Sequence, residues 1–264
     1  MKQNYSHFYE KYSYLAPVIF AKDIILTRSS ARRISLVNRL HDYVGFKGNS
    51  NLFNLHRKIN NRLSTFSESW SSHDYGEGYF YQSFDAVGIS GLRDTRARIE
   101  EMNIRNLVVD KSVIDIGCNA GFVSLAVADM ARQVIGFDIH PGLIDIGILV
   151  QKYLKLNNVQ LTASSFENFV VQEPVDVVLS LANHSTYDGN TRQSVKDYFG
   201  KCQLLLKPGG CMLFESHHPQ YENKESLEKV CEVMKDFFTI HERMSLQRGT
   251  FFDRGRTFIV AGRK

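Results

Sequence analysis

Short runs of apolar residues alternate with segments of helical spacing along the second half of the chain. Four short runs predict strands at residues 113–116, 133–137, 159–162 and 175–179, and the continuous apolar runs at 113–116 and 175–179 predict that those two strands are buried. A fifth run, residues 211–214, follows Leu-Lys-Pro-Gly-Gly, which predicts the end of a helix and a turn into a strand. A helix of small residues is expected over residues 124–130. Strands that alternate with helices predict an α/β protein with a largely parallel sheet.

Apolar periodicity predicts further elements on both sides of this alternating region. Residues 238–246 and 256–262 are expected to form an antiparallel hairpin at the end of the chain. Apolar side chains at three- and four-residue spacing predict helices over residues 29–45 and 52–63. Another helix is expected over residues 95–107, with Asp94 as its N-cap.

These elements and the charge distribution divide the chain into three parts. The predicted parts are a basic helical N-terminal extension (1–70), a lid segment with a helix (71–107) and the α/β domain (108–264). Residues 1–65 carry eleven Lys or Arg and three Asp or Glu, a net charge of +8, whereas the whole chain has +4. The basic character therefore belongs to the extension. Residues 71–84 are polar, aromatic and glycine-containing, so we expect them to fold over a binding site.

The cysteines and the N-terminus indicate a cytoplasmic protein. Four cysteines occur without a C-x-x-C pair or a metal-binding spacing, which indicates reduced, buried thiols. Charged residues interrupt the apolar residues near the N-terminus, and no stretch has the length of a transmembrane span.

The turn after the first predicted strand is the strongest functional signal. It reads Asp115-x-Gly117-x-Asn119-x-Gly121, and glycines between a strand and a helix let the backbone approach a ligand. Asp138, at the tip of the second predicted strand, is placed to accept hydrogen bonds from a ribose diol. A dinucleotide fingerprint starting at Gly117 would need glycines at positions 119 and 122, which hold Asn and Phe. The pattern predicts a nucleoside cofactor other than a dinucleotide.

The turn resembles motif I of the class I S-adenosylmethionine (SAM) methyltransferases, with Asn119 in place of the middle glycine. The resemblance covers roughly residues 108–264 and implies a seven-stranded, mostly parallel, doubly wound Rossmann-like sheet. It also implies that SAM is the cofactor. The positions that it assigns to the cofactor are Asp115, Gly117, Cys118, Asn119, Gly121, Asp138, Ile139, Phe166, Glu167 and Ser180. Cys118 is interpreted as a small side chain that fits the turn, not as a nucleophile.

A weaker resemblance links residues 81–99 to methyltransferases related to the tRNA wobble-uridine carboxymethyltransferases. It implies that Arg93 holds the carboxylate end of the cofactor. The alternative is that Arg93, Arg96 and Arg98 merely solvate the surface of a helix.

Histidines after the fourth and fifth predicted strands could remove a proton from a methyl acceptor. His184 is the first candidate for a general base, because a neutral imidazole accepts a proton near neutral pH, and His217 is the second. Asn183, Ser185 and Tyr187 could orient the ring of His184. Tyr81, Tyr187 and His218 are candidate substrate contacts. These histidines, with Asp188 and Glu215, could in principle hold a metal, but no local ligand spacing supports one, so none is predicted.

The resulting hypothesis is a SAM-dependent methyltransferase acting on a hydroxyl or amine of a small acceptor. Neither an N-P-P-Y motif nor a Pro-Cys pair follows the fourth strand, which argues against nucleobase methylation. The acceptor is expected to be anionic, a saccharide or a secondary metabolite. A tRNA-modifying transferase is the main alternative, because the basic extension could contact phosphates, but no RNA-binding motif is present and nucleic acid is not favoured. A non-catalytic SAM-binding protein is the other alternative.

Overall fold

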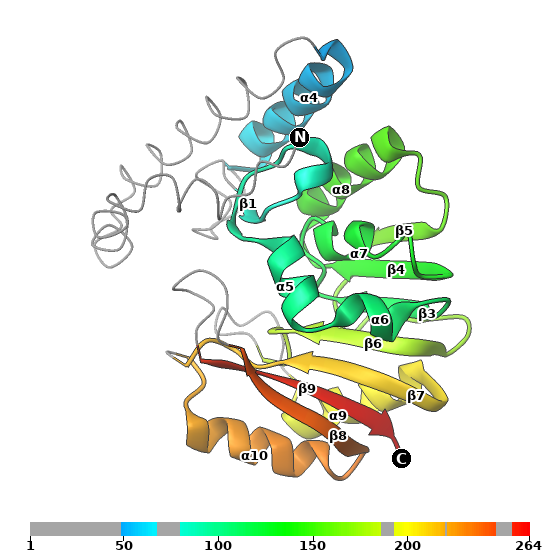
Figure 1. Cartoon of the computed structure of the whole chain (residues 1–264), viewed down its shortest axis with the longest axis vertical. Helices are drawn as coiled ribbons and strands as arrows, with labels where there is room; N and C mark the ends of the chain where they lie inside the picture. The colour runs from blue at the N-terminus through cyan, green and yellow to red at the C-terminus, as the bar shows by residue number, and fades with distance from the viewer. Residues whose placement is uncertain (1–48, 68–79, 186–192, 220, 247–254) are drawn as a thin grey trace.

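A seven-stranded sheet lies at the centre of the computed structural model, which describes residues 49–67, 80–185, 193–219, 221–246 and 255–264 (Figure 1). Its strands are β3 (Ser112–Ile116), β4 (Gln133–Asp138), β5 (Val159–Ala163), β6 (Val175–Leu181), β7 (Leu206–Glu215), β8 (Phe238–Leu246) and β9 (Arg256–Arg263). Their order is β5-β4-β3-β6-β7-β9-β8. The first five pair in parallel, and β9 runs antiparallel to β7 and β8. The predicted seven-stranded, mostly parallel sheet is confirmed.

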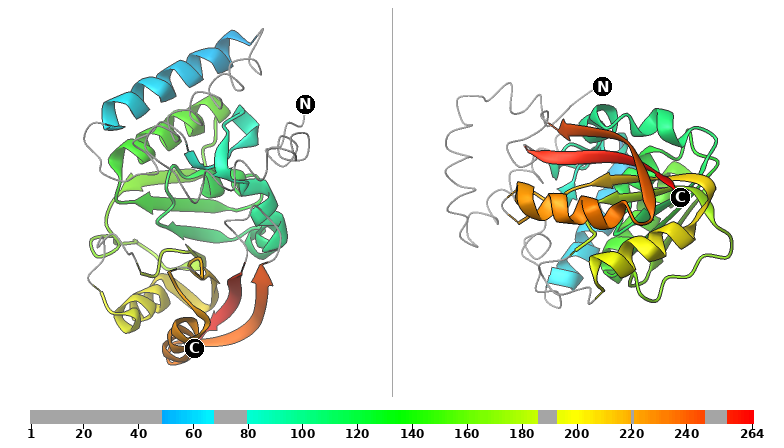
Figure 2. Two further views of the ribbon diagram at one scale, coloured as in Figure 1. Left: turned by 90° about the vertical axis from the view of Figure 1, so that its left-hand side faces the viewer. Right: turned by 90° about the horizontal axis from the view of Figure 1, so that it is seen from below.

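Helices cover both faces of this sheet (Figure 2). One face carries α5 (Thr95–Glu101), α6 (Ile104–Val108), α7 (Phe122–Ala126) and α8 (Pro141–Leu154), and the other carries α9 (Val195–Leu205) and α10 (Lys224–Met234). Neighbouring residues of a strand point to opposite faces, so Val113 joins the first hydrophobic cluster and Ile114 the second. Both faces of β3 are therefore buried, as its continuous apolar run predicts.

Two predicted helices are shorter in the structure. The helix expected over residues 95–107 breaks into α5 and α6, because Asn103 adopts a left-handed backbone conformation (φ 51°). The helix expected over residues 124–130 is α7, which ends at Ala126. Beyond it, the carbonyls of Ala128 and Ala131 accept hydrogen bonds from Asn158 Nδ2 at 2.7 and 3.0 Å, instead of helical amides. The N-cap prediction is confirmed, since the Asp94 side chain accepts from the Ala97 amide at 3.0 Å.

The strand β7 begins earlier than predicted. The sequence predicts a turn at residues 206–210 and a strand from residue 211, whereas β7 already pairs at Leu206, opposite Val175 of β6. The pairing register shifts between Val175 and Val177, and this irregularity absorbs the two glycines that made the segment resemble a turn. The terminal hairpin of β8 and β9 is confirmed.

The helix α4 (Ser50–Ser67) contains the helix predicted at residues 52–63 and packs on α8. Leu55, Ile59 and Leu63 are buried in the same cluster as the face of the sheet beneath α8. Between α4 and α5, two short strands pair in parallel, β1 (Phe80–Gln82) and β2 (Gly91–Arg93). β1 forms where the sequence predicts irregular structure, whereas residues 29–45 and 71–79 lie outside the described residues. The division of the chain at residue 70 stays a prediction.

No helix within the described ranges is long and apolar enough to span a membrane.

Candidate functional site

The chemically important side chains gather where the parallel strands end. The turn of residues 117–121 follows β3, Asp138 ends β4, and Asn183 and His184 follow β6. His217 follows β7. Because β3, β4, β6 and β7 are parallel, these segments share one edge of the sheet, which is where ligands bind in doubly wound folds.

The turn after β3 contains three residues with left-handed backbone conformations. These are Gly117 (φ 61°), Asn119 (φ 59°) and Gly121 (φ 72°). The Asn119 side chain accepts from the Ala120 amide at 2.8 Å, which explains how asparagine occupies the position where the motif has glycine. Asp138 Oδ2 accepts from the Asn119 amide at 2.8 Å, so the tip of β4 and the turn are held together.

The turn after β3 is tightly packed against β4 and α8. Cys118 is 2% exposed, and its Sγ would lie 3.1 Å from a Cβ on Gly136. Burial raises the pKa of the Cys118 thiol well above its usual range, so the thiol stays protonated. These observations support the interpretation that Cys118 fills space. On the other side, α8 comes so close that a Cβ on Gly147 would lie 2.5 Å from the Ala120 carbonyl oxygen.

Asp115 is buried beside this turn. It accepts a hydrogen bond from Ser124 Oγ at 2.6 Å and is 2% exposed. Burial raises the pKa of Asp115 to about 7. The sequence identifies Asp115 as a motif residue, but its raised pKa results from burial and could not be predicted from the motif.

Beyond the tips of β4 and β5, aromatic and apolar side chains flank the edge of the sheet. Phe166 is half-buried and lies nearly parallel to Phe137, with 6.4 Å between ring centroids. Its ring also lies 4.6 Å from that of Tyr198. Ile139 is 40% exposed next to Asp138, although it is apolar. The half-buried Phe166 and the exposed Ile139 offer apolar surface suited to a planar base, while Glu167 is exposed.

Ser180 and Asn183 fix the loop that follows β6. Ser180 is fully buried, and its hydroxyl donates to Asn183 Oδ1 at 2.9 Å and lies 2.8 Å from the Tyr198 hydroxyl. Asn183 Nδ2 donates to the Ile116 carbonyl, which ties the loop to the end of β3. A direct contact between Ser180 and the cofactor stays a prediction.

His184 and Glu222 form a buried pair beyond β6. His184 Nε2 lies 2.7 Å from Glu222 Oε1, and Glu222 Oε2 accepts from the His217 amide at 2.9 Å. Burial raises the pKa of Glu222, but His184, through its hydrogen bond and its charge, and His217, through its backbone amide and its charge, together outweigh burial and lower the pKa. The ionised carboxylate only accepts, so Nε2 donates, and a neutral imidazole then carries its lone pair on Nδ1. That Nδ1 is buried and has no hydrogen-bond partner among the described residues.

His217 and His218 lie on the neighbouring strand end. The rings of His217 and His184 are 4.6 Å apart, and burial together with His184 lowers the pKa of His217. Burial and the nearby Arg256 lower the pKa of the half-buried His218. Both imidazoles are therefore neutral near pH 7. Tyr187 and Asp188 lie outside the described residues.

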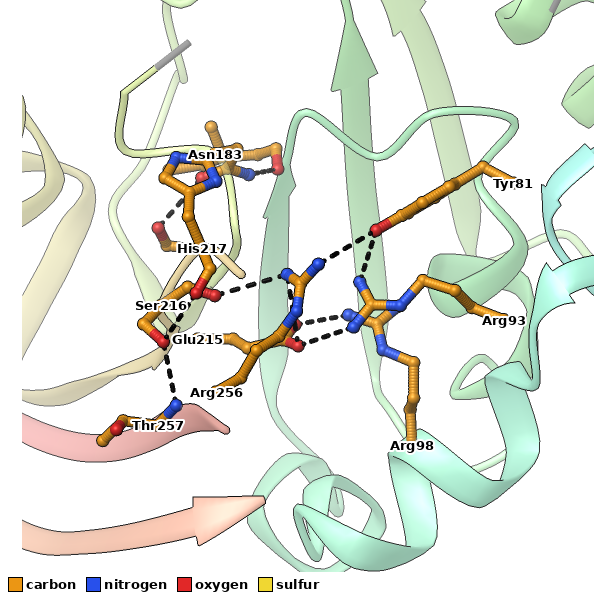
Figure 3. A network of polar contacts seen from close by, with 11 residues as sticks. Tyr81, Arg93, Arg98, Asn183, Glu215, Ser216, His217, Arg256 and Thr257 are labelled. Carbon is orange, nitrogen blue, oxygen red and sulfur yellow. Dashed lines mark hydrogen bonds and ion pairs between the residues drawn. The ribbon is translucent and has the colours of Figure 1, made fainter. Parts of the chain in front are cut away.

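The arginines of the segment before β3 separate into two kinds. Arg96 is exposed and pairs with Glu100 at 2.7 Å, as expected for a helix surface. Arg93 and Arg98 are buried, and both contact the carboxylate of Glu215 (Figure 3). For these two residues the interpretation as solvated surface side chains is wrong.

Tyr81 and Arg256 complete this group, which we call the arginine cluster (Tyr81, Arg93, Arg98, Glu215 and Arg256). The Tyr81 hydroxyl accepts from Arg93 Nη1 at 2.6 Å and from Arg256 Nη2 at 3.3 Å (Figure 3). Burial raises the pKa of Glu215, but the guanidinium groups of Arg98, Arg93 and Arg256 outweigh it and hold the pKa at about 2. Glu215 is thus an ion-pair partner, and no group of three or more potential metal ligands occurs among the described residues.

Sequence reasoning missed Glu222, Arg98 and Arg256 as parts of the site. Glu222 is 38 residues from His184, and no local motif links them. Arg98 lies two residues from the exposed Arg96 in the same helix, and the sequence does not distinguish the two. Arg256 is the first residue of β9, which lies two strands beyond β6 in the sheet. The one signal in the sequence concerns Arg256, which begins a predicted strand of the terminal hairpin, whereas no predicted element begins or ends at Glu222.

The residues at this edge fit the chemical groups of SAM. Asp138 is half-buried, so its carboxylate can accept hydrogen bonds from a ribose diol. Ile139 and Phe166 present apolar surface against which a planar base such as adenine could pack. The left-handed turn lets backbone approach the amino-acid portion of the cofactor.

Comparisons with known proteins agree with this fit. A family profile described as "Methyltransferase domain" matches residues 107–255. The ubiquinone biosynthesis O-methyltransferase of Bradyrhizobium sp. (strain ORS 278) is 26% identical over 157 residues, which cover 58% of each chain. The U6 snRNA methylphosphate capping enzyme Amus of Drosophila melanogaster is 27% identical over 152 residues, covering 50% of this chain and 49% of the relative. The chain thus spans about half to three fifths of the length of these relatives.

Solved structures share the fold. The N-methyltransferase NodS from Bradyrhizobium japonicum WM9, in complex with S-adenosyl-L-homocysteine (SAH), superposes with a TM-score of 0.55 and 15% identity. The superposition covers 78% of this chain and 98% of NodS. Because the methyltransferase-domain match covers more than half of the sequence and the sheet has the order and directions of this fold, the chain belongs to the class I SAM-dependent methyltransferases.

Proposed function

We propose that this protein transfers a methyl group from SAM to a hydroxyl of a small acceptor, with His184 as the general base. The pairing of His184 with Glu222 carries this proposal, because it leaves Nδ1 as the basic atom of a neutral imidazole. The similarity to an O-methyltransferase of ubiquinone biosynthesis supports oxygen as the acceptor atom. If the acceptor is instead a neutral amine, methyl transfer requires no general base.

The residues divide the work between cofactor and acceptor. Bound SAM would supply an electrophilic methyl group on its sulfonium sulfur. Asp138 and the turn of residues 117–121 would hold the cofactor so that this methyl group faces the end of β6. His184 would accept the proton of the acceptor hydroxyl at Nδ1, and the Glu222 carboxylate would stabilise the imidazolium that forms.

The burial of His184 sets a condition on the acceptor. The His184 side chain is 0% exposed and packs against the rings of Phe214 and His217, at 4.8 and 4.6 Å. An acceptor must therefore displace a contact that now covers Nδ1. The same burial excludes water, which favours methyl transfer to the acceptor over hydrolysis.

The test measures SAH release with candidate acceptors and compares three variants. With a hydroxyl acceptor, His184→Asn should lower kcat by about 10²–10⁴-fold and leave SAM affinity unchanged, the size expected for loss of a general base. Glu222→Gln should also lower kcat, because the neutral glutamine side chain no longer stabilises the imidazolium. His217→Asn is the matched control. Near-wild-type turnover of His184→Asn would rule out this residue as the base.

The acceptor panel separates the proposal from its alternatives. It should contain phenols, saccharides, small amines and tRNA. Methylation of tRNA alone would favour the tRNA-modifying alternative, to which the similarity with an RNA-capping enzyme is relevant. SAM binding without transfer to any acceptor would favour a non-catalytic SAM-binding protein.

A further inference from the structure

The helix α9 contacts the turn that follows β5, where we expect the adenine of SAM to lie. The turn is closed by the Phe169 amide, which donates to the Ser165 carbonyl at 3.0 Å. Its start is fixed by the Ser164 amide, which donates to the Asp138 carbonyl at 2.9 Å. The turn therefore begins beside the residue that is expected to hold the ribose.

Lys201, near the end of α9, donates to two main-chain carbonyls of this turn. Its Nζ bonds to the Phe166 carbonyl and, at 3.0 Å, to the Glu167 carbonyl. The same ammonium lies over the Phe166 ring, 4.9 Å from the ring centroid, a distance at which a cation is attracted to an aromatic face. One side chain thus holds both the backbone and the ring of Phe166.

Tyr198 contacts the same ring from one turn earlier in α9. The ring centroids of Tyr198 and Phe166 are 4.6 Å apart. Residues three positions apart lie on the same face of a helix, so Tyr198 and Lys201 both face the turn after β5. The Tyr198 hydroxyl donates to Asn183 Oδ1 at 2.8 Å, in the loop after β6. Tyr198 therefore packs against the ring, whereas Lys201 holds the backbone of the turn.

The burial of Lys201 shows that these contacts set its position. Lys201 is half-buried, and burial lowers its pKa although the charge of Glu167 opposes the shift. Taking an ammonium group partly out of water costs free energy, and a lysine on a helix can extend into solvent instead. Lys196, in the same helix, is exposed. The contacts with the turn offset the cost at Lys201.

We infer that Lys201 is a positioning residue for the adenine base of SAM. By holding the Phe166 and Glu167 carbonyls, it keeps the turn and the Phe166 ring in place before the cofactor binds, which reduces the ordering that binding requires. Lys201 acts through the turn and not by contact with SAM. The inference goes beyond the proposed function, since it concerns the cofactor and not the acceptor, and it rests on the proposed contact of Phe166 with adenine.

The test uses calorimetric titration with two ligands, SAH and S-ribosylhomocysteine, which is SAH without its adenine. The affinity for S-ribosylhomocysteine is measured by its competition with SAH. We expect Lys201→Met to bind SAH about 10-fold more weakly, as for loss of a charged hydrogen-bonding partner, and to bind S-ribosylhomocysteine like the wild type. Lys201→Arg keeps a positive charge and N–H donors, so it should retain SAH affinity. Lys196→Met is the matched control, because it removes the same charge from an exposed position of α9.

Three results would overturn the inference. The first is unchanged SAH affinity in Lys201→Met, or a loss no larger than that of Lys196→Met. The second is an equal loss for both ligands in Lys201→Met, which would mean a general distortion of the site. The third is an equal loss of SAH affinity in Lys201→Met and Lys201→Arg. If Lys201→Met does not fold, Lys201→Gln takes its place in the same comparison.

Phe166→Ala tests the underlying assignment of the adenine separately. It should weaken SAH and leave S-ribosylhomocysteine unaffected. If it binds both ligands like the wild type, the base lies elsewhere and the inference fails with the assignment. These measurements need no turnover, so their outcome does not depend on whether His184 is the general base.

Discussion

Gly147, in the middle of α8, limits how closely this helix can approach the cofactor turn. A Cβ at this position would lie 2.5 Å from the Ala120 carbonyl oxygen and 2.7 Å from Leu161 Cδ1. The first of these contacts is to backbone, so a side-chain rotation cannot relieve it. Gly147→Ala must therefore push α8 and the turn apart, and such overpacking costs about 1–3 kcal/mol.

Gly200, in the middle of α9, is the matched control. A Cβ there would meet only the Phe237 ring, at 3.4 Å, which is an ordinary contact. Both substitutions gain about 1 kcal/mol of helix propensity, so the difference between them isolates the steric cost. We expect Gly147→Ala to be less stable than Gly200→Ala by about 1–3 kcal/mol in urea unfolding. It should also bind SAH more weakly in calorimetry, because Ala120 belongs to the turn. Equal stability of the two variants with unchanged SAH affinity would refute this description of the turn.

Two further predictions concern the buried carboxyl group and the N-terminal helix. The pKa of Asp115 is about 7 in the folded protein and 3.8 in the reference state, so its contribution to stability is complete below pH 3.8 and is lost as the pH rises through 7. Between pH 5 and 8, urea unfolding should show wild-type stability falling by up to about 1.4 kcal/mol per pH unit relative to Asp115→Asn; parallel pH profiles would argue against it. Ile59→Ala in α4 should cost about 2–5 kcal/mol, because Ile59 is 1% exposed. The same small effect for Ile59→Ala and for Phe53→Ala, at a 43% exposed position, would mean that α4 does not pack on the core.

The sheet and the glycine-containing turn after β3 could be predicted because their signals are local. The strands β3 and β6 are short, β-branched runs that are buried nearly throughout, as their continuous apolar sequence predicts, whereas the edge strand β5 alternates between buried and exposed residues. Asp138 is identified by its place at the end of one such run. Asn119 takes the place of a glycine without losing the left-handed turn, because its side chain bonds to the next amide.

The surroundings of His184 and Glu215 could not be predicted because their contacts join distant parts of the chain. Arg96 and Arg98 are two positions apart in one helix, yet only Arg98 points to Glu215, 117 residues further along. Helical spacing alone cannot show which of the two faces a carboxylate. The sequence offers only the neighbours of His184 to orient its ring, but Asn183 donates to the Ile116 carbonyl instead, and the residue that contacts the imidazole is Glu222.

Calorimetric titration of SAM into the wild type and Asp138→Ala tests the central claim most directly, namely that this edge of the sheet binds SAM. The wild type should bind one equivalent. Asp138→Ala should lose about 1–3 kcal/mol of binding free energy, because a charged acceptor for the ribose hydroxyls is gone. Asp129→Ala, on the exposed surface, should bind like the wild type. Equal SAM affinity in folded Asp138→Ala and wild type, or no SAM binding by the wild type, would contradict the account.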